Sequence, residues 1–224
     1  MTFKNLIDDT LDLCQELQGK PDFTVVRVKR MINRAYYDFA RQTRCLRTEL
    51  NIATVANQES YAINDEVYDF HHLRYVTDST AEYGKILYPY PGGYSKLPRN
   101  KGFGEPVYYY IVGIVTRTKS EIGFYPIPDA VEAVKGWCTI FPGGTSAPEL
   151  TLDAHVPLFK DAWHDALVHY AVWKLFASYS HLNPAINRKS LEFKTFYNSD
   201  VQDFQMNNIF GGELNQVYDS YAEY

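Results

Sequence analysis

The sequence predicts an α+β fold: a helical core of about four helices formed by both ends of the chain, with a β-rich insertion between the second and third helices. Apolar residues recur at helical spacing up to residue 47 and again after Pro157. Between these segments the apolar period changes to two, and glycine- and proline-rich stretches separate the short runs. With 224 residues, 46% hydrophobic and 22% charged, the composition is globular.

These patterns divide the chain into four segments. Residues 1–47 are expected to form the first part of the helical core, and residues 48–156 the insertion, which is of a sandwich or barrel-like type. Residues 157–206 are expected to complete the core. Residues 207–224 have no sustained period, so we expect them to form an extended C-terminal arm.

The first segment predicts two helices. One follows the apolar residues from Phe3 to Leu17 and ends at Gly19. Thr24 can cap the other, because its hydroxyl can accept a hydrogen bond from the first-turn amides. One side of this second helix is apolar, with Val28, Ile32, Ala35, Phe39 and Leu46. The opposite side is expected to face outward and carries Arg27, Arg30, Arg34 and Arg41.

The insertion is predicted to be a series of short strands. Leu50 and Ile52 alternate with polar residues, as do Tyr61 and Ile63 after a turn. Further strand candidates are residues 70–77, 107–116, 121–125 and 134–141. The connection at 88–106 is long for a compact domain, and such loops are usually functional or mobile. We expect this loop to become ordered on a partner.

The helical period returns after Pro157. Residues 157–180 have a broad apolar surface and are expected to form the central helix of the core. Asn183 can cap a fourth helix, which carries Ile186, Phe193, Tyr197, Val201 and Phe204. The arm that follows is too aromatic for a solubilising tail, since it contains Phe210, Tyr218, Tyr221 and Tyr224.

The sequence favours neither a disulfide framework nor a membrane span. The three cysteines are far apart and no CxxC occurs. The first residues carry acids where a signal peptide would be apolar, and no run reaches the ~18 apolar residues of a membrane span. We therefore expect synthesis in a reducing cytoplasm and no membrane partner.

Charge is distributed unevenly along the chain. Residues 27–47 carry seven basic side chains and one acid, whereas the last 30 residues carry five acids and no Lys or Arg. The formal net charge of −5 therefore arises entirely in the last 30 residues. A basic segment near the front and an acidic end favour contacts with copies or partners at least as readily as with nucleic acid.

The best catalytic candidate is the segment DAWHDALVH at residues 161–169. Asp161, His164 and Asp165 have spacings of three and four, and the His-Asp pair is similar to that of metal phosphohydrolases. Further ligands at a matching spacing are missing, and His164 and His169 point about 140° apart on a helix. We interpret them as polar residues on the solvent side of a half-buried helix. A metal hydrolase remains an alternative, and bound metal in the purified chain would reveal it.

Other motifs do not favour catalysis. His71 and His72 are adjacent in a strand candidate and therefore face opposite sides. Neither a nucleophile elbow nor a Walker-type or dinucleotide-binding glycine motif occurs. The 19 tyrosines suit aromatic stacking on single strands, protein interfaces or core packing. We expect no catalytic residue, no cofactor and no metal site.

The ordered set of segments resembles the head-to-tail adaptor proteins of tailed bacteriophages, also called connector or head completion proteins. The resemblance covers most of residues 24–180. It rests on MINRAYYDFARQTRCLR, LNIATVANQESYAI, GEPVYYYIVG, GFYPIPDAVEAV and VPLFKDAWHDALVHYAVWKLF. The Pro/Gly/Tyr-rich loop at 88–106 departs from the family pattern.

This resemblance implies a structural virion protein without catalysis. Such proteins form a ring under the portal, usually a dodecamer, and their C-terminal segments reach into portal subunits. The implied partners are the portal, a tail or nozzle component and further copies of the chain. DNA passes through the channel without specific binding. The implied location is the neck or tail of the virion, after synthesis in the host cytoplasm.

Two groups of residues are predicted to serve assembly. We interpret Arg27, Arg30, Arg34 and Arg41 as contacts to the portal or to an adjacent subunit's carboxylates, either the arm or Asp8, Asp9, Asp12 and Glu16. A solvated helix face and direct DNA contact are the alternatives. The arm is interpreted as a portal-docking segment anchored by its aromatics, with a frayed terminus as the alternative. The alternative function is a sequence-independent nucleic-acid-binding protein using the basic helix at 27–47.

Overall fold

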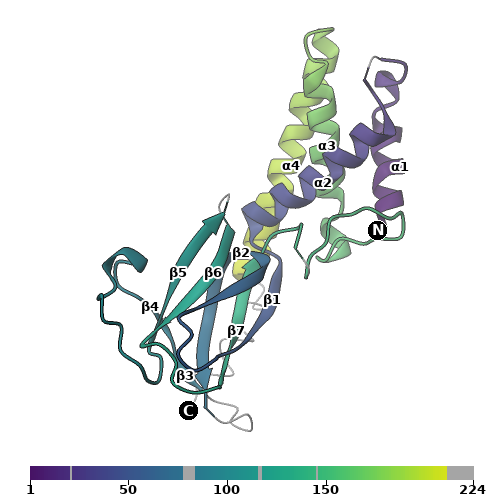
Figure 1. Cartoon of the computed structure of the whole chain (residues 1–224). Helices are drawn as coiled ribbons and strands as arrows, with labels where there is room; N and C mark the ends of the chain where they lie inside the picture. The colour runs from purple at the N-terminus through teal and green to yellow at the C-terminus, as the bar shows by residue number, and fades with distance from the viewer. Residues whose placement is uncertain (21, 78–83, 116–117, 145, 211–224) are drawn as a thin grey trace. The chain divides into compact units, whose positions relative to one another are not determined.

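A computed structural model describes residues 1–20, 22–77, 84–115, 118–144 and 146–210 (Figure 1). The chain divides into two compact units. A helical unit combines Met1–Cys45 with Glu149–Tyr224, and a β unit comprises Leu46–Pro148. The described parts hold four α-helices, and the β unit lies between the second and third of them. The predicted α+β class is therefore confirmed.

The first two helices follow the sequence pattern, but both end earlier than expected. The helix expected to run through Leu17 to Gly19 stops at Leu13, and a short 3₁₀ turn at Gln15–Leu17 follows it. α1 spans Phe3–Leu13 and α2 spans Val25–Thr43. The Thr24 hydroxyl accepts a hydrogen bond from the Arg27 amide at 3.3 Å, so the predicted cap is confirmed. Of the predicted apolar face, Val28, Ile32, Ala35 and Phe39 are buried on α2, and Tyr36 and Ala40 are buried beside them.

The second helix is shorter than its basic segment. Arg44 takes a left-handed conformation with φ 54°, which ends α2 after Thr43. Leu46 and Arg47 then belong to the β unit. The expectation of a helix reaching residue 47 was wrong, and the seven basic residues of 27–47 do not lie on one helix.

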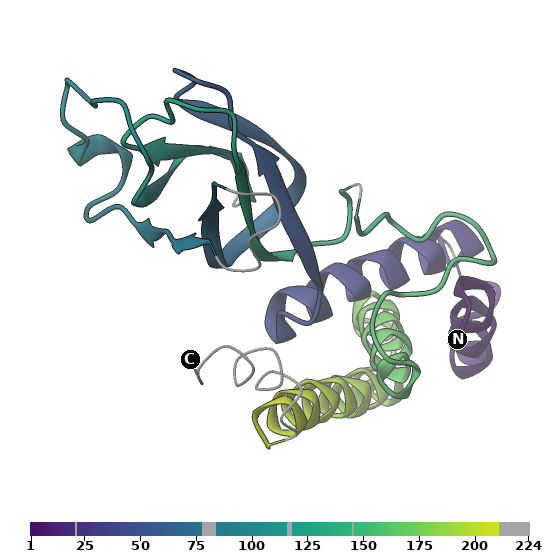
Figure 2. The ribbon, with the colours of Figure 1, turned by 90° about the horizontal axis from the view of Figure 1, so that it is seen from below.

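The last two helices pack side by side (Figures 1 and 2). α3 spans Asp165–Ser178 and is preceded by a short 3₁₀ turn at Asp161–Trp163. α4 spans Pro184–Phe210, and the Ala185 amide donates to Oδ1 of Asn183 at 2.8 Å, which confirms the predicted cap. α3 is the central helix, because α1, α2 and α4 all pack against it.

A polar contact ties α2 to α4 within this apolar core. The Tyr197 side chain is 1% exposed, and its hydroxyl donates to Asp38 at 2.8 Å. Nε2 of Gln42 donates to the same carboxylate at 2.6 Å, and Nη2 of Arg41 donates to it at 3.0 Å. Burial and the nearby Asp38 charge raise the pKa of Tyr197. The phenol therefore stays protonated and continues to donate.

The β unit contains one continuous path of paired strands. In its described part they are β1 Arg47–Ala53, β2 Ser60–Val76, β3 Lys85–Ile86, β4 Tyr88–Pro89, β5 Tyr108–Val115, β6 Thr118–Tyr125 and β7 Ala133–Ile140. The order is β1-β7-β2-β6-β5-β4, with β3 paired to β2. β2 pairs with β6 mainly through its first half and with β7 and β3 through its second half. It is therefore shared by two four-stranded halves.

The sequence pattern suggested two separate strands where the structure has the single strand β2. Its register shifts between Ala62 and Val67 and between His71 and Arg74. His72 has φ 51° at the second shift, which marks a bulge rather than a strand end. Nε2 of His71 lies 2.8 Å from Oγ1 of Thr139, so His71 contacts a neighbouring strand. Bulges keep a strand continuous while interrupting its period of two.

The loop at 88–106 is ordered by contacts within the β unit, so the expectation that it needs a partner for order was wrong. Lys101 forms an ion pair with Glu59. Its ammonium also lies 5.0 Å from the Tyr94 ring centroid and 5.3 Å from that of Tyr110. The Gly104 amide donates to the carbonyl of Ile127 at 2.9 Å.

Gly123 provides a test of packing in the β unit. A Cβ at this position would lie 2.4 Å from the Tyr110 ring. We predict that Gly123→Ala lowers the free energy of unfolding of the β unit by about 1–3 kcal/mol, since the ring cannot move without strain. Urea unfolding measures this. The cost should shrink when Tyr110→Leu removes the ring, and an equal cost in both backgrounds would contradict the assignment.

Candidate interaction surfaces

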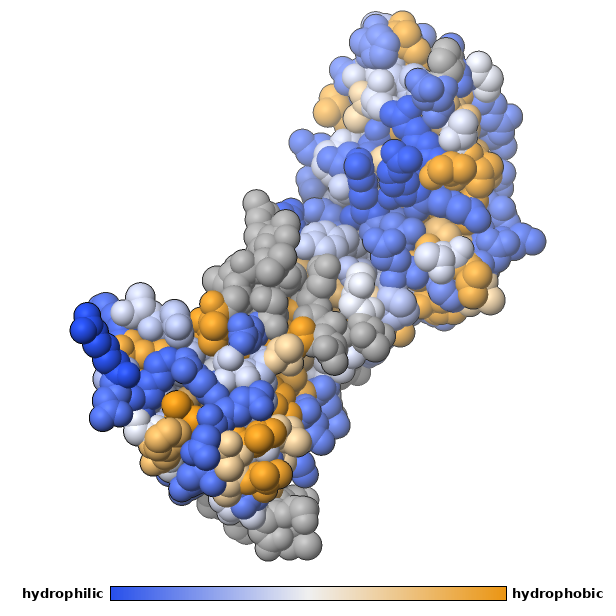
Figure 3. All heavy atoms as spheres, in the orientation of Figure 1, coloured by the Kyte–Doolittle hydropathy of each residue, from blue (hydrophilic) through white to orange (hydrophobic). Residues whose placement is uncertain are grey.

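The predicted arginine row lies on the outer side of α2. Arg27, Arg34 and Arg41 are seven residues apart, so they follow one stripe of the helix. Arg30 is one turn before Arg34, and both side chains are exposed. Neither forms a salt bridge with another residue that the structure describes. Hydrophilic side chains cover most of the helical unit's surface over α2 (Figure 3).

The other two arginines have partners within the chain. Nη1 of Arg27 donates to the Tyr179 hydroxyl at 3.3 Å, and its guanidinium carbon lies 5.3 Å from that ring's centroid. Arg41 is paired with Asp38, as described above. Arg27 thus ties the start of α2 to the end of α3, whereas the Arg41–Asp38 pair lies within α2 itself. The two arginines best placed to contact another molecule are Arg30 and Arg34.

Two lysines that the sequence did not single out extend this basic surface. Nζ of Lys174 on α3 lies 3.6 Å from the Trp173 ring centroid, and Nζ of Lys194 on α4 lies 5.6 Å from it. Burial lowers the pKa of Lys174; the charge of Asp38 opposes this effect and that of Lys194 adds to it. We call Arg30, Arg34, Arg41, Lys174 and Lys194 the basic face.

The residues of the basic face come from three helices. Burial is the main reason for the raised pKa of Tyr170 on α3. The charge of Asp38 on α2 also raises this pKa, and the charges of Arg34 and Arg41 lower it. The charges of Asp38 and Lys194 in turn act on the pKa of Lys174. Arg41 on α2 and Lys174 on α3 therefore lie near the same Asp38 carboxylate, and Lys174 and Lys194 on α4 share the Trp173 ring. The sequence reveals the arginine stripe, but only packing brings the lysines beside it.

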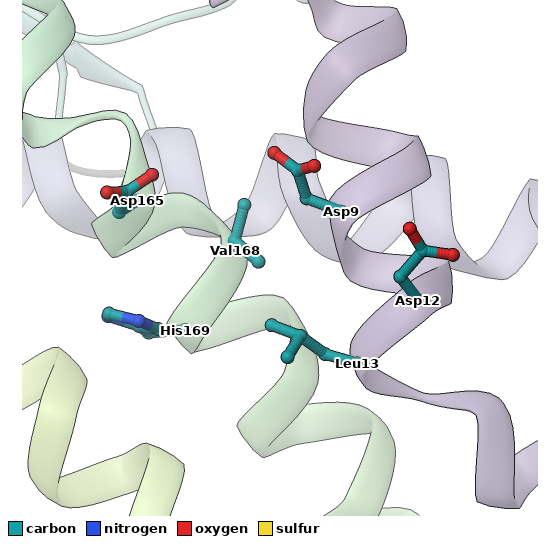
Figure 4. A pocket seen from close by; sticks show the side chains of 6 residues that line it. All are labelled: Asp9, Asp12, Leu13, Asp165, Val168 and His169. Carbon is teal, nitrogen blue, oxygen red and sulfur yellow. The ribbon is translucent and has the colours of Figure 1, made fainter.

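An acidic groove lies between α1 and α3 (Figure 4). It has a volume of about 340 Å³ and is lined by Asp9, Asp12, Leu13, Asp165, Val168 and His169. Partial burial raises the pKa of Asp9, and the charges of Asp165, Asp12 and Asp8 act in the same direction. These carboxylates therefore repel one another. A cation entering the groove would relieve that repulsion.

The acidic residues predicted as partners do not all lie in this groove. Asp9 and Asp12 line it, whereas Glu16 forms an ion pair with Lys189 on α4. Nδ1 of His169 lies 2.6 Å from Oδ2 of Asp200, so α4 adds a carboxylate beside the groove. Asp165 was noticed in the sequence as a catalytic candidate, but its position here is on the groove wall.

His164 differs from its predicted solvent position. Its side chain is fully buried, and Nε2 lies 2.9 Å from the carbonyl oxygen of Phe159. The physical reason is that α3 begins only at Asp165, so the preceding 3₁₀ turn directs His164 inward. Among the residues that the structure describes, no three His, Cys, Asp or Glu side chains come together as metal ligands.

The aromatic arm is only partly within the described residues. α4 continues to Phe210, so residues 207–210 have helical backbone rather than the extended form expected for the arm. Tyr218, Tyr221 and Tyr224 lie outside the described residues. Of the helices that can be described, none is both long and apolar enough to cross a membrane.

The helical unit thus carries a basic face and an acidic groove, and the β unit is inserted between α2 and α3. The chain matches the family described as SU10 adaptor protein over residues 1–213. It belongs to that family, which is a phage head-to-tail adaptor family. The resemblance drawn from the sequence is therefore confirmed. No curated protein matches the chain.

The buried His164 predicts a pH dependence of stability. Burial lowers its pKa below the ordinary value of 6.5, because the charged imidazolium loses its hydration. The unfolded chain then binds a proton that the folded chain does not, so the free energy of unfolding of the helical unit should fall as the pH drops below 6.5. Urea unfolding of the full chain between pH 7 and about pH 5.5 measures this slope.

Two variants make this prediction specific. His164→Asn should flatten the slope over this range, whatever its effect on stability at pH 7. His181→Asn, at an exposed position, should leave the slope unchanged. A slope that is the same in all three proteins would show that His164 does not cause it.

Proposed function

We propose that this chain is a ring-forming head-to-tail adaptor that docks beneath the portal, joins the capsid to the tail and forms part of the DNA exit channel. Its proposed partners are the portal, a tail or nozzle component and further copies of itself, in a ring that by family analogy is a dodecamer. The observation that carries the proposal is the family match over residues 1–213. The exposed Arg30 and Arg34 supply a surface on which such contacts can form.

The basic face is proposed to bind carboxylates of neighbouring proteins rather than the DNA. A ring would repeat these cations many times, and neutralising roughly 6–10 phosphates makes affinity change by about 10³–10⁵ between low and moderate salt. A channel wall of that kind would retain DNA that must leave quickly. Guanidinium groups also match carboxylates well, because their planar fork can form two parallel hydrogen bonds.

The C-terminal arm is proposed to dock on the portal. Residues 211–224 contain three tyrosines and three acids, with no Lys or Arg. Tyrosine is enriched at protein interfaces because its ring buries apolar area while its hydroxyl still finds a hydrogen-bond partner. This segment follows the end of α4 directly, so its removal leaves every described helix complete.

Charge reversal tests the role of the basic face. We predict that Arg30→Glu with Arg34→Glu lowers incorporation of the adaptor into portal-bearing capsids by at least about tenfold, because like charges would then oppose each other across the contact. Quantitative immunoblotting of purified capsids measures incorporation. Lys135→Glu, at an exposed site on β7, is the matched control and should incorporate normally. Normal incorporation of the double variant would show that Arg30 and Arg34 are not part of the interface.

Truncation tests the arm separately. A chain ending at Phe210 should keep the thermal unfolding and circular dichroism of the full chain, because it retains all of α4. We predict that it fails to attach to portal-bearing capsids, since the tyrosine anchors are lost. Attachment equal to that of the full chain would exclude a docking role for residues 211–224.

A further inference from the structure

We propose that the acidic groove of one copy receives the basic face of the next copy, so that the ring is built by a head-to-tail contact within the helical unit. This inference rests on the ring proposed above, and it assigns which two surfaces meet. The acidic groove contributes Asp9, Asp12 and Asp165. The basic face contributes Arg34, Lys174 and Lys194.

The two surfaces lie on opposite sides of the same helix. Asp165 and Lys174 are nine residues apart on α3, which is about two and a half turns, so their side chains point in opposite directions. Asp165 lines the groove beside α1, whereas Lys174 lies near Asp38 on α2. A contact between different surfaces on opposite sides of a subunit is heterologous. Repeated with a rotation that closes, such a contact generates a ring.

The groove combines an apolar floor with a charged rim, which is the usual anatomy of a protein interface. Leu13 is 43% exposed and lines the groove together with Val168. Phe196, 42% exposed, packs against the His169 ring at 5.5 Å between centroids. Leu13 and Phe196 therefore leave apolar area uncovered in the single chain, beside the buried Val168. A partner with an aromatic centre and surrounding cations would cover it.

The basic face has an aromatic ring beside it, that of Trp173. Lys174 and Lys194 lie over the indole of Trp173, so an aromatic ring stands among ammonium groups. Burial already lowers the pKa of Lys174, and placing its ammonium beside carboxylates would offset the cost of removing it from water. Because both surfaces are present on every copy, charge complementarity favours a second copy as the occupant. The portal, as an alternative occupant, becomes an outcome of the test.

A charge exchange between the two surfaces tests the contact. One variant carries Arg34→Glu and Lys194→Glu on the basic face, and the other carries Asp9→Lys and Asp12→Lys in the groove. Each alone presents surfaces of the same sign and should assemble on portal-bearing capsids at least about tenfold less than the wild type. An equimolar mixture should regain assembly, because each variant's altered surface then meets its complement on the other. Lys135→Glu is again the matched control.

The outcomes separate this inference from the proposed function. Wild-type protein that does not bind portal-bearing capsids would contradict the function itself. Wild type that binds, together with single-surface variants that bind equally well, would overturn the pairing of these two faces. Loss in both variants with no recovery in the mixture would also overturn it, and would point to the portal as the occupant. Circular dichroism of each variant identifies misfolding. If one variant fails to fold, a chain carrying all four changes repeats the test, because its two exchanged surfaces are again complementary.

Discussion

The helical unit depends on the enclosure of α3. Most of its side chains are buried, with Ala166, Leu167, Val168, Tyr170, Ala171, Val172, Leu175 and Phe176. A helix that is apolar on nearly every side must be surrounded by other helices. The sequence supplies these helices from both ends of the chain, so the β unit has to be an insertion. This arrangement also determines where the charged surfaces lie, since α1, α2 and α4 leave α3 accessible only between them.

The contact between Asp38 and Tyr197 fixes α4 against α2. A hydrogen bond to a charged group contributes about 1.5–3 kcal/mol, and here the hydroxyl belongs to a buried ring. Tyr197 also packs against Tyr170 at 5.1 Å between ring centroids. Asp38 thereby places the α4 lysine beside the α2 arginines. One carboxylate both stabilises the core and moderates the positive charge of the basic face.

The β unit shows a different use of aromatic residues. Tyr90 packs against Tyr108 and Tyr125 at 5.6 and 5.4 Å, and Tyr94 against Tyr110 at 5.7 Å. These pairs fasten the loop at 88–106 to β5 and β6. Many of the 19 tyrosines therefore pack within a single chain, although their number alone suited an interface equally well. The shape of this loop is therefore set by contacts within the single chain.

The sequence by itself determined the local features. Thr24 and Asn183 predicted the starts of α2 and α4. The apolar stripe predicted the buried side of α2, and the arginine row predicted its outer side. Each depends on residues only a few positions apart, so periodicity and capping chemistry reveal them. The fold class follows from the same local signals.

Only the tertiary structure decided which side chains from distant parts of the chain lie side by side. Lys174 and Lys194 join arginines more than 130 residues away, Asp165 joins α1, and His164 turns inward because α3 starts late. The bulges of β2 and the fastening of the loop by Lys101 likewise depend on partners in other strands. Such contacts form only when separate helices or strands pack together. The spacing of side chains along one helix does not show which face of another helix it will contact.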